Sequence, residues 1–374
     1  MKDRGEWMSA IAGDDKEELG VLIGSGLSFE EQDAFGDSPI HWAATMGSEE
    51  CLKLLIASGD NPMRLNSRGD CPLALAVVRR REGCARILAA HGGDFFASGG
   101  QTTLMIAAGM GMHGLIKDLS AKASIDLSDK FGKTALHFAA QAGHAQASSA
   151  LIECGANPDA RDCKDNTPLM LACSATSSPE CVEALASISN MESVNDAGLR
   201  AIDVAESQRV PFAVKALLER VPSQEDASNI FWRAVLAFRG EEMAVAVAPW
   251  LDKASRNALE QTPFMMAARL GWAQAALAVA EQSDRLATDS AGNNALMLLC
   301  DRPSWSAVSE ELFVAAATPQ ACMARNHEGL RAEDIALSHS HLTLSLRLSA
   351  LRENEELTSS VAQCDFKKGP SIRL

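Results

Sequence analysis

Residues 132–160 read GKTALHFAAQAGHAQASSALIECGANPDA, and this stretch decides the expected fold. Its apolar residues recur at helical spacing in two short segments, which is typical of amphipathic helices. Thr134 stands where a hydroxyl can accept from the free amides of a first helical turn. Gly155 stands where a second helix would end in a left-handed residue. The stretch therefore predicts a helix, a turn and a second helix.

The same pattern returns along most of the chain, at steps of 29 to 37 residues. One position, occupied by alanine in all but one copy, marks the period: Ala43, Ala76, Ala107, Ala139, Ala172, Ala205, Ala234, Ala267, Leu299 and Ala336. Threonine or serine followed by proline recurs at the expected helix starts, as in Ser38-Pro39 and Thr167-Pro168. Proline suits the first helical position, because its missing N–H costs nothing there. A regular period of this length indicates a repeat protein.

The pattern resembles the ankyrin repeat, whose signature is a glycine turn, T-P-L-H-x-A-A, a G-H pair and L-L-x-x-G-A. The resemblance implies an all-α fold, an ankyrin-repeat solenoid of stacked helix-turn-helix units with short β-turn or hairpin loops. It also implies that the motif histidines, His41 and His137, bond across the loops and tie adjacent repeats together. A single unit cannot bury its own apolar face, so stability should come from contacts between neighbouring repeats.

The resemblance also suggests a division of the chain. We expect an N-terminal capping helix pair at residues 1–32 and an array of about ten repeats at residues 33–352. The pattern is degenerate near residues 206–260 and 300–325. Residues 353–374 lack helical periodicity and are expected to form a loosely ordered tail.

Composition narrows the possible functions. Of 374 residues, 47% are apolar and 22% charged, which is typical of a folded chain. The net charge of −15 argues against a nucleic-acid-binding protein, because a phosphate backbone needs a cationic surface. The longest strongly apolar stretch, residues 243–251, is too short for a membrane span, and residues 1–19 do not read as a secretory signal. Ten cysteines without a C-x-x-C pair favour free thiols in a cytoplasmic protein. An exported effector with a signal in its tail is the alternative.

No motif predicts an enzyme. Residues 109–114, GMGMHG, match G-x-G-x-x-G, but the period places them between two helices, whereas a dinucleotide site needs a strand and a helix. His339 and His341 have no cysteine or carboxylate at metal-ligand spacing. No nucleophile, Walker, kinase or H-E-x-x-H motif is present. We therefore expect no catalysis, no cofactor and no metal.

The resemblance implies that a partner protein binds the concave face, made by the loop tips and the exposed side of each first helix. The positions carried over to this chain are Phe35, Asp37, Met46, Arg68, Arg79, Met110, Lys130, Phe131, Lys133, Gln141 and Lys164. Phenylalanine at a loop tip has little structural use, and exposed aromatic side chains are typical interface anchors.

Charge indicates the kind of partner. Residues 64–133 carry 10 basic and 6 acidic side chains, whereas residues 1–63 carry 4 basic and 13 acidic ones. This basic band favours an acidic or amphipathic segment of another protein, although Arg79, Arg80 and Arg81 could simply be a solvated helix end. We therefore expect a monomeric, non-catalytic scaffold or adaptor. A pathogen effector that engages host proteins through its repeats and a self-assembling structural component are the alternatives.

Overall fold

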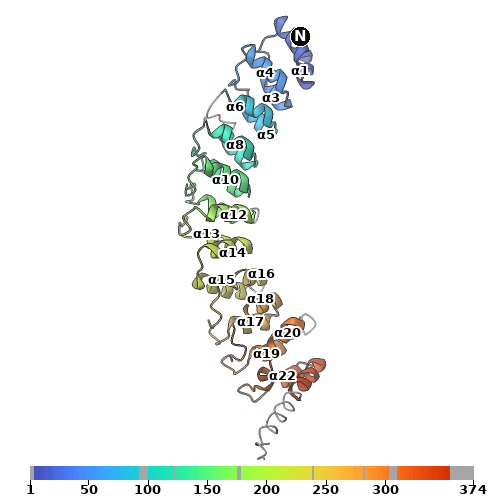
Figure 1. Ribbon diagram of the computed structural model, residues 1–374, viewed down its shortest axis with the longest axis vertical. Helices are drawn as coiled ribbons and strands as arrows, with labels where there is room; N and C mark the ends of the chain where they lie inside the picture. The colour runs from blue at the N-terminus through green and yellow to red at the C-terminus, as the bar shows by residue number, and fades with distance from the viewer. Residues whose placement is uncertain are drawn as a thin grey trace, which may run out of the picture. The chain divides into compact units, whose positions relative to one another are not determined.

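The computed structural model describes residues 4–91, 100–121, 123–174, 178–237, 240–280, 283–302 and 310–353 (Figure 1). Within these ranges the regular elements are α-helices and there is no strand, so the predicted all-α class is confirmed. The chain separates into two compact units, residues 1–220 and residues 221–374, and each is described by itself. The predicted tail, apart from its first residue, lies outside the described residues.

Unit 1 is built from consecutive helix pairs. Its helices are α1 (Arg4–Ala12), α2 (Lys16–Gly24), α3 (Pro39–Met46), α4 (Glu49–Ala57), α5 (Pro72–Val78), α6 (Glu82–Ala89), α7 (Thr103–Gly109), α8 (His113–Ser120), α9 (Ala135–Gln141), α10 (Ala145–Glu153), α11 (Pro168–Ala172), α12 (Pro179–Ala186), α13 (Ala201–Ser207) and α14 (Pro211–Arg220).

The helix pairs of unit 1 stack in two layers. Each first helix, from α1 to α13, packs on the next first helix, and each second helix, from α2 to α14, packs on the next second helix. The period-marking alanines of this unit, such as Ala43 and Ala139, have no exposed surface. Ile40 of α3 and Leu136 of α9 are also buried. Small side chains let the helices approach closely while the larger ones fill the space between them.

The helix starts follow from local chemistry. Ser38, Thr134, Thr167 and Thr262 have extended backbone angles directly before their helices, as predicted for N-caps. The Thr167 hydroxyl accepts from the Met170 amide at 3.4 Å. The hydroxyls of Ser38 and Thr134 instead lie 2.9 Å from Nδ1 of His41 and His137, so the acceptance predicted for Thr134 is not observed. The loops that join one pair to the next, here called fingers, turn at Gly36, Gly69, Gly100 and Gly132 with φ between 76° and 84°, a conformation that favours glycine.

Unit 2 repeats this arrangement less regularly. Its helices are α15 (Gln224–Leu236), α16 (Glu241–Val247), α17 (Pro263–Leu270), α18 (Ala273–Ala280), α19 (Ala295–Cys300), α20 (Glu310–Ala316), α21 (Pro319–Met323) and α22 (Ala332–Ser338), followed by helical residues 342–353. The helices α15, α17, α19 and α22 pack in sequence as one layer. The helices α16, α18 and α20 pack in sequence as the other.

The weak repeats have a structural explanation. Residues 187–200 separate α12 from α13 and include a finger, but only residues 221–223 separate α14 from α15. The copy that begins with α15 therefore has no finger, which accounts for the 29-residue step in the period. The division between the two units falls in the same stretch of sequence. Residues 303–309, in the second stretch where the pattern is degenerate, lie outside the described residues.

Candidate functional site

Eight fingers in the described residues are each organised by one aspartate or asparagine side chain. The Asp33 Oδ1 atom accepts hydrogen bonds from the backbone amides of Phe35 (2.7 Å) and Asp37 (2.9 Å). The Asp129 Oδ1 atom accepts from the amides of Phe131 and Lys133, both at 2.9 Å. The same double acceptance recurs at Asn66, Asp162, Asn195, Asn257, Asp289 and Asn326. The side-chain oxygen thus satisfies two backbone amides of the same turn, and the residues at the tip point outward.

Neighbouring fingers are joined by direct hydrogen bonds. The Cys163 amide donates to the Phe131 carbonyl at 2.8 Å, and the Asp196 amide donates to the Lys164 carbonyl at 3.1 Å. Asn66 Nδ2 donates to Asp37 Oδ1 at 2.7 Å. These bonds fix the spacing of the tips before any partner arrives, which lowers the entropy lost on binding.

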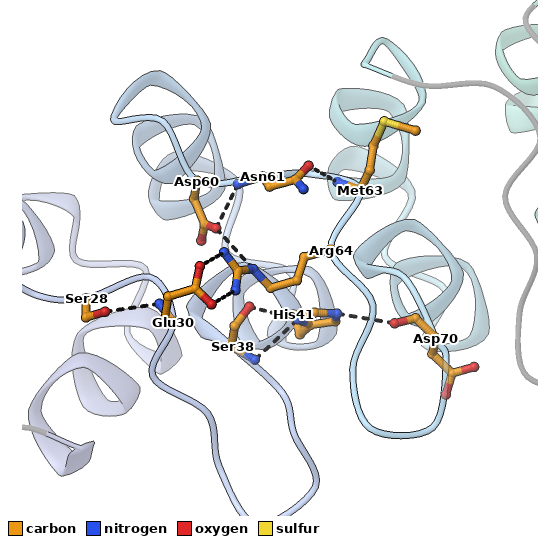
Figure 2. Close-up of polar contacts among 9 residues, drawn as sticks. All are labelled: Ser28, Glu30, Ser38, His41, Asp60, Asn61, Met63, Arg64 and Asp70. Carbon is orange, nitrogen blue, oxygen red and sulfur yellow. Dashed lines mark hydrogen bonds and ion pairs between the residues drawn. The ribbon is translucent and has the colours of Figure 1, made fainter.

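The motif histidines join the repeats as the resemblance implied. His41 Nδ1 accepts from the Ser38 amide at 3.2 Å, so the ring carries its proton on Nε2 and donates to the Asp70 carbonyl at 3.2 Å (Figure 2). His137 makes the same pair of bonds, to the Thr134 amide and the Asn166 carbonyl. Burial lowers the pKa of both imidazoles, which favours the neutral ring. Neither histidine is available as a ligand.

Four of the predicted binding residues form two cation–aromatic contacts at the finger tips. The Arg68 guanidinium lies 5.1 Å from the centre of the Phe35 ring, on the neighbouring finger. Lys130 Nζ lies 5.0 Å from the centre of the Phe131 ring. Both rings are more than half exposed, at 60% for Phe35 and 57% for Phe131. A cation held over an exposed ring presents an apolar surface and a positive charge together.

The other predicted positions are more dispersed. Lys133 Nζ donates to Gln141 Oε1 at 2.8 Å, which joins a finger to the end of α9. Met46 is partly exposed at the end of α3, and Lys164 is exposed at its own finger tip. Arg79 and the half-buried Met110 cap the C-terminal ends of α5 and α7, and lie away from the finger tips at the other end of the repeat. The predicted set is thus a row of finger-tip groups plus a separate row of helix-end groups.

The basic residues of the chain differ in their contacts according to where they lie in the repeat. On the second helices, Arg86 of α6 lies 3.3 Å from Asp118, and Lys117 of α8 lies 2.8 Å from Glu153. In contrast, within the described ranges no carboxylate lies within ion-pair distance of the predicted binding cations, which are Arg68, Arg79, Lys130, Lys133 and Lys164.

A buried carboxylate near the first fingers escaped the sequence analysis. Arg64 forms a two-point ion pair with Glu30, at 2.5 and 2.8 Å, and its Nε lies 3.8 Å from Asp60 Oδ1 (Figure 2). Asp60 is only 3% exposed, and its Oδ2 atom has no hydrogen-bond partner. Burial raises the pKa of Asp60 to about 6. The sequence did carry a signal, because Asp60 stands where Ala156 follows Gly155 in the closest copy of the motif.

A groove in unit 2 also escaped the sequence analysis. It encloses about 370 Å³ between the exposed sides of α19 and α22 and the two fingers that precede these helices. Its lining includes Asp301, Glu328 and His339, at the positions in the repeat that Thr45, Arg68 and Arg79 take in unit 1. Extending the same positions into the later repeats would have identified it.

Two kinds of site were searched for and not found in the part of the chain that the structure describes. No three histidine, cysteine or carboxylate side chains cluster closely enough there to hold a metal ion. No described helix has the length and apolar character needed to span a membrane.

The sequence matches known repeat proteins. A family model of three ankyrin repeats matches residues 7–98 and 104–197. Neurogenic locus notch homolog protein 1 of Xenopus tropicalis is 39% identical over 74 residues, which is 20% of this chain and 3% of that protein. Inversin of Danio rerio is 42% identical over 72 residues, 18% of this chain and 7% of that protein. The chain thus spans a small fraction of the length of these curated relatives.

A solved structure gives the same fold. The ankyrin repeat domain of human ASB11 superposes with a TM-score of 0.50 at 24% identity, covering 57% of this chain and 96% of that one. The repeated motif, the family match and the stacked helix pairs agree, and this chain is an ankyrin-repeat protein. Ankyrin repeats generally mediate protein–protein interaction and are typically non-catalytic.

Proposed function

We propose that this protein is a non-catalytic scaffold or adaptor that binds a partner protein through the concave face of unit 1. We define this face by the finger tips and the exposed sides of α3, α5, α7, α9 and α11. The observation that carries the proposal is the pairing of cations with exposed aromatic rings at the tips, at Arg68–Phe35 and Lys130–Phe131.

The acidic and basic side chains of the fingers make different contacts within the protein. At three fingers of unit 1 the organising residue is an aspartate, because Asp33, Asp129 and Asp162 each use one oxygen to accept from two backbone amides of their own turn. Among the cations, Arg68 and Lys130 lie over the Phe35 and Phe131 rings, and Lys133 donates to Gln141 Oε1. The tips therefore present positive charge and aromatic surface, which suits an acidic or amphipathic segment that brings carboxylates and apolar side chains together.

The protein is further proposed to act as a monomer in a reducing compartment such as the cytoplasm. Nine of the ten cysteines lie in the described part of the chain, where all nine are free and most are buried. Burial raises the pKa of Cys173 and Cys300 to about 12, so these groups remain protonated thiols near neutral pH. Buried thiols of this kind behave as small apolar side chains and are typical of intracellular proteins.

Charge reversal on the concave face tests the proposal. The full chain with Arg68→Glu, Arg79→Glu and Lys130→Glu is compared with wild type by affinity capture from cell extract and cross-linking mass spectrometry. The matched control carries Arg86→Glu, Lys117→Glu and Lys215→Glu on the second helices, with the same change in net charge. We expect the partner to be lost only with the first variant, and its cross-linked segment to be acidic or amphipathic. Equal capture by both variants would refute the proposed face.

A further inference from the structure

The groove of unit 2 has an apolar floor. Leu298 and Ile335 are 5% and 8% exposed, and both line the groove. Leu330, at the finger before α22, is 37% exposed and forms part of the wall. A space of about 370 Å³ is within the range of sites that hold small ligands or a few side chains. The floor therefore suits one aliphatic side chain from a partner.

The rim of the groove is acidic. Glu328 is exposed at the finger tip, and Asp301, whose side chain is 53% exposed, lies at the C-terminal end of α19. Asp301 Oδ1 lies 3.6 Å from Nε2 of His339, the residue that follows α22, so these two residues close one end of the groove. In the described part of unit 2, no arginine or lysine lies within ion-pair distance of either carboxylate.

The arginines nearest to the groove are directed elsewhere. Arg331 pairs with Glu333 at 3.4 Å, and Arg325 donates to the Gly329 carbonyl at 2.5 Å. The Arg302 guanidinium lies against Gly271, so closely that a side chain at that glycine would collide with it. None of the three lines the groove. The acidic rim is thus left without a cation of its own.

We propose that this groove is a second binding site, for a short peptide segment in which a lysine or arginine adjoins an aliphatic residue. The aliphatic side chain packs over Leu298 and Ile335, and the cation pairs with Glu328 and Asp301. The partner is opposite in charge to the one proposed for the concave face of unit 1. The two sites use the same positions of the repeat, with Glu328 in the place of Arg68, and neither proposal depends on the other.

Peptide selection tests this site on the full chain. A random short-peptide library displayed on phage is selected on wild type, and each recovered peptide is measured by fluorescence polarisation on two variants. Asp301→Asn with Glu328→Gln removes the rim charge and keeps the side-chain shapes. Glu242→Gln with Glu311→Gln removes two exposed charges of unit 2 outside the groove and is the matched control.

We expect a class of peptides that loses about tenfold or more in affinity on the rim variant alone, and whose members carry Lys or Arg beside Leu, Ile or Met. If no recovered peptide depends on the rim, or if the dependent peptides are acidic, the proposal is wrong. Peptides that bind the concave face of unit 1 are recognised separately, because they respond to Arg68→Glu, Arg79→Glu and Lys130→Glu and not to the rim variant.

Discussion

A single carboxylate decides part of the stability of the first repeat. Asp60 follows the end of α4 at the place that Ala123 and Ala156 take in later repeats. The Asp60 side chain is almost completely buried, and Arg64, the cation that faces it, already forms two hydrogen bonds with Glu30. A pKa of about 6 means that burial outweighs the attraction of Arg64. The folded state therefore binds a proton at Asp60 more tightly than the unfolded state does.

This shift sets the direction of a pH dependence. Between the unfolded pKa near 3.8 and the folded pKa of about 6, the folded protein holds more protons at Asp60, so its contribution to stability falls as pH rises. Replacing Asp60 with Ala should raise the free energy of unfolding near neutral pH by about 1–3 kcal/mol. The gain should vanish at about pH 4. Urea unfolding across this range, followed by circular dichroism, measures the difference, and parallel curves for the two proteins would contradict it.

At the scale of the element, the fingers depend on close approach of the backbone. Gly132 has φ of 76°, and a Cβ atom there would lie 2.9 Å from the Cys163 amide nitrogen. That amide donates to the Phe131 carbonyl, so a larger side chain would disturb the bond between two fingers. Gly69 has φ of 84° but nothing within 4 Å of its Cβ position. A substitution at Gly69 would therefore cause backbone strain alone, whereas one at Gly132 would add a steric conflict.

Valine at each position should therefore give unequal losses. We expect Gly69→Val to cost about 1–3 kcal/mol from positive φ alone. Gly132→Val should cost at least about 1 kcal/mol more, because it adds the collision with the next finger. Thermal melts followed by circular dichroism test the difference. Equal losses would mean that the second finger moves aside at no cost.

Elements with a local cause were predictable from the sequence. Some features depend on a few adjacent residues, such as the N-cap positions of Ser38 and Thr134 and the turn at Gly132. The hydrogen bonds of His41 and His137 between repeats follow from the family motif. The missing finger before α15 was not predictable, because the weak copy there leaves the helix boundaries undetermined. The contact of Arg68 with Phe35 depends on side-chain orientation across two repeats, which periodicity does not specify. The groove of unit 2 was missed because its positions were carried over only into the first five repeats.

At the scale of the whole molecule, charge acts in two opposite ways. The net charge of −15 makes the compact chain repel itself, and salt screens this repulsion. The ion pairs observed on the surface, such as Arg86–Asp118 and Lys117–Glu153, are weakened by the same salt. Exposed pairs of this kind contribute about 0–1 kcal/mol each. With 49 acidic and 34 basic side chains, the unbalanced carboxylates should dominate.

Salt should therefore stabilise the fold while weakening both proposed sites. Between about 20 mM and about 500 mM NaCl, we expect the urea midpoint to rise, because the Debye length shrinks from more than about 20 Å to less than about 5 Å. Over the same range, an acidic segment on the concave face of unit 1 and a cationic peptide in the groove of unit 2 should both bind less tightly. Because stability and affinity change in opposite directions, loss of binding in salt cannot result from unfolding. A midpoint that falls with salt would instead show that specific pairs, such as Arg64–Glu30, contribute more than the net charge removes.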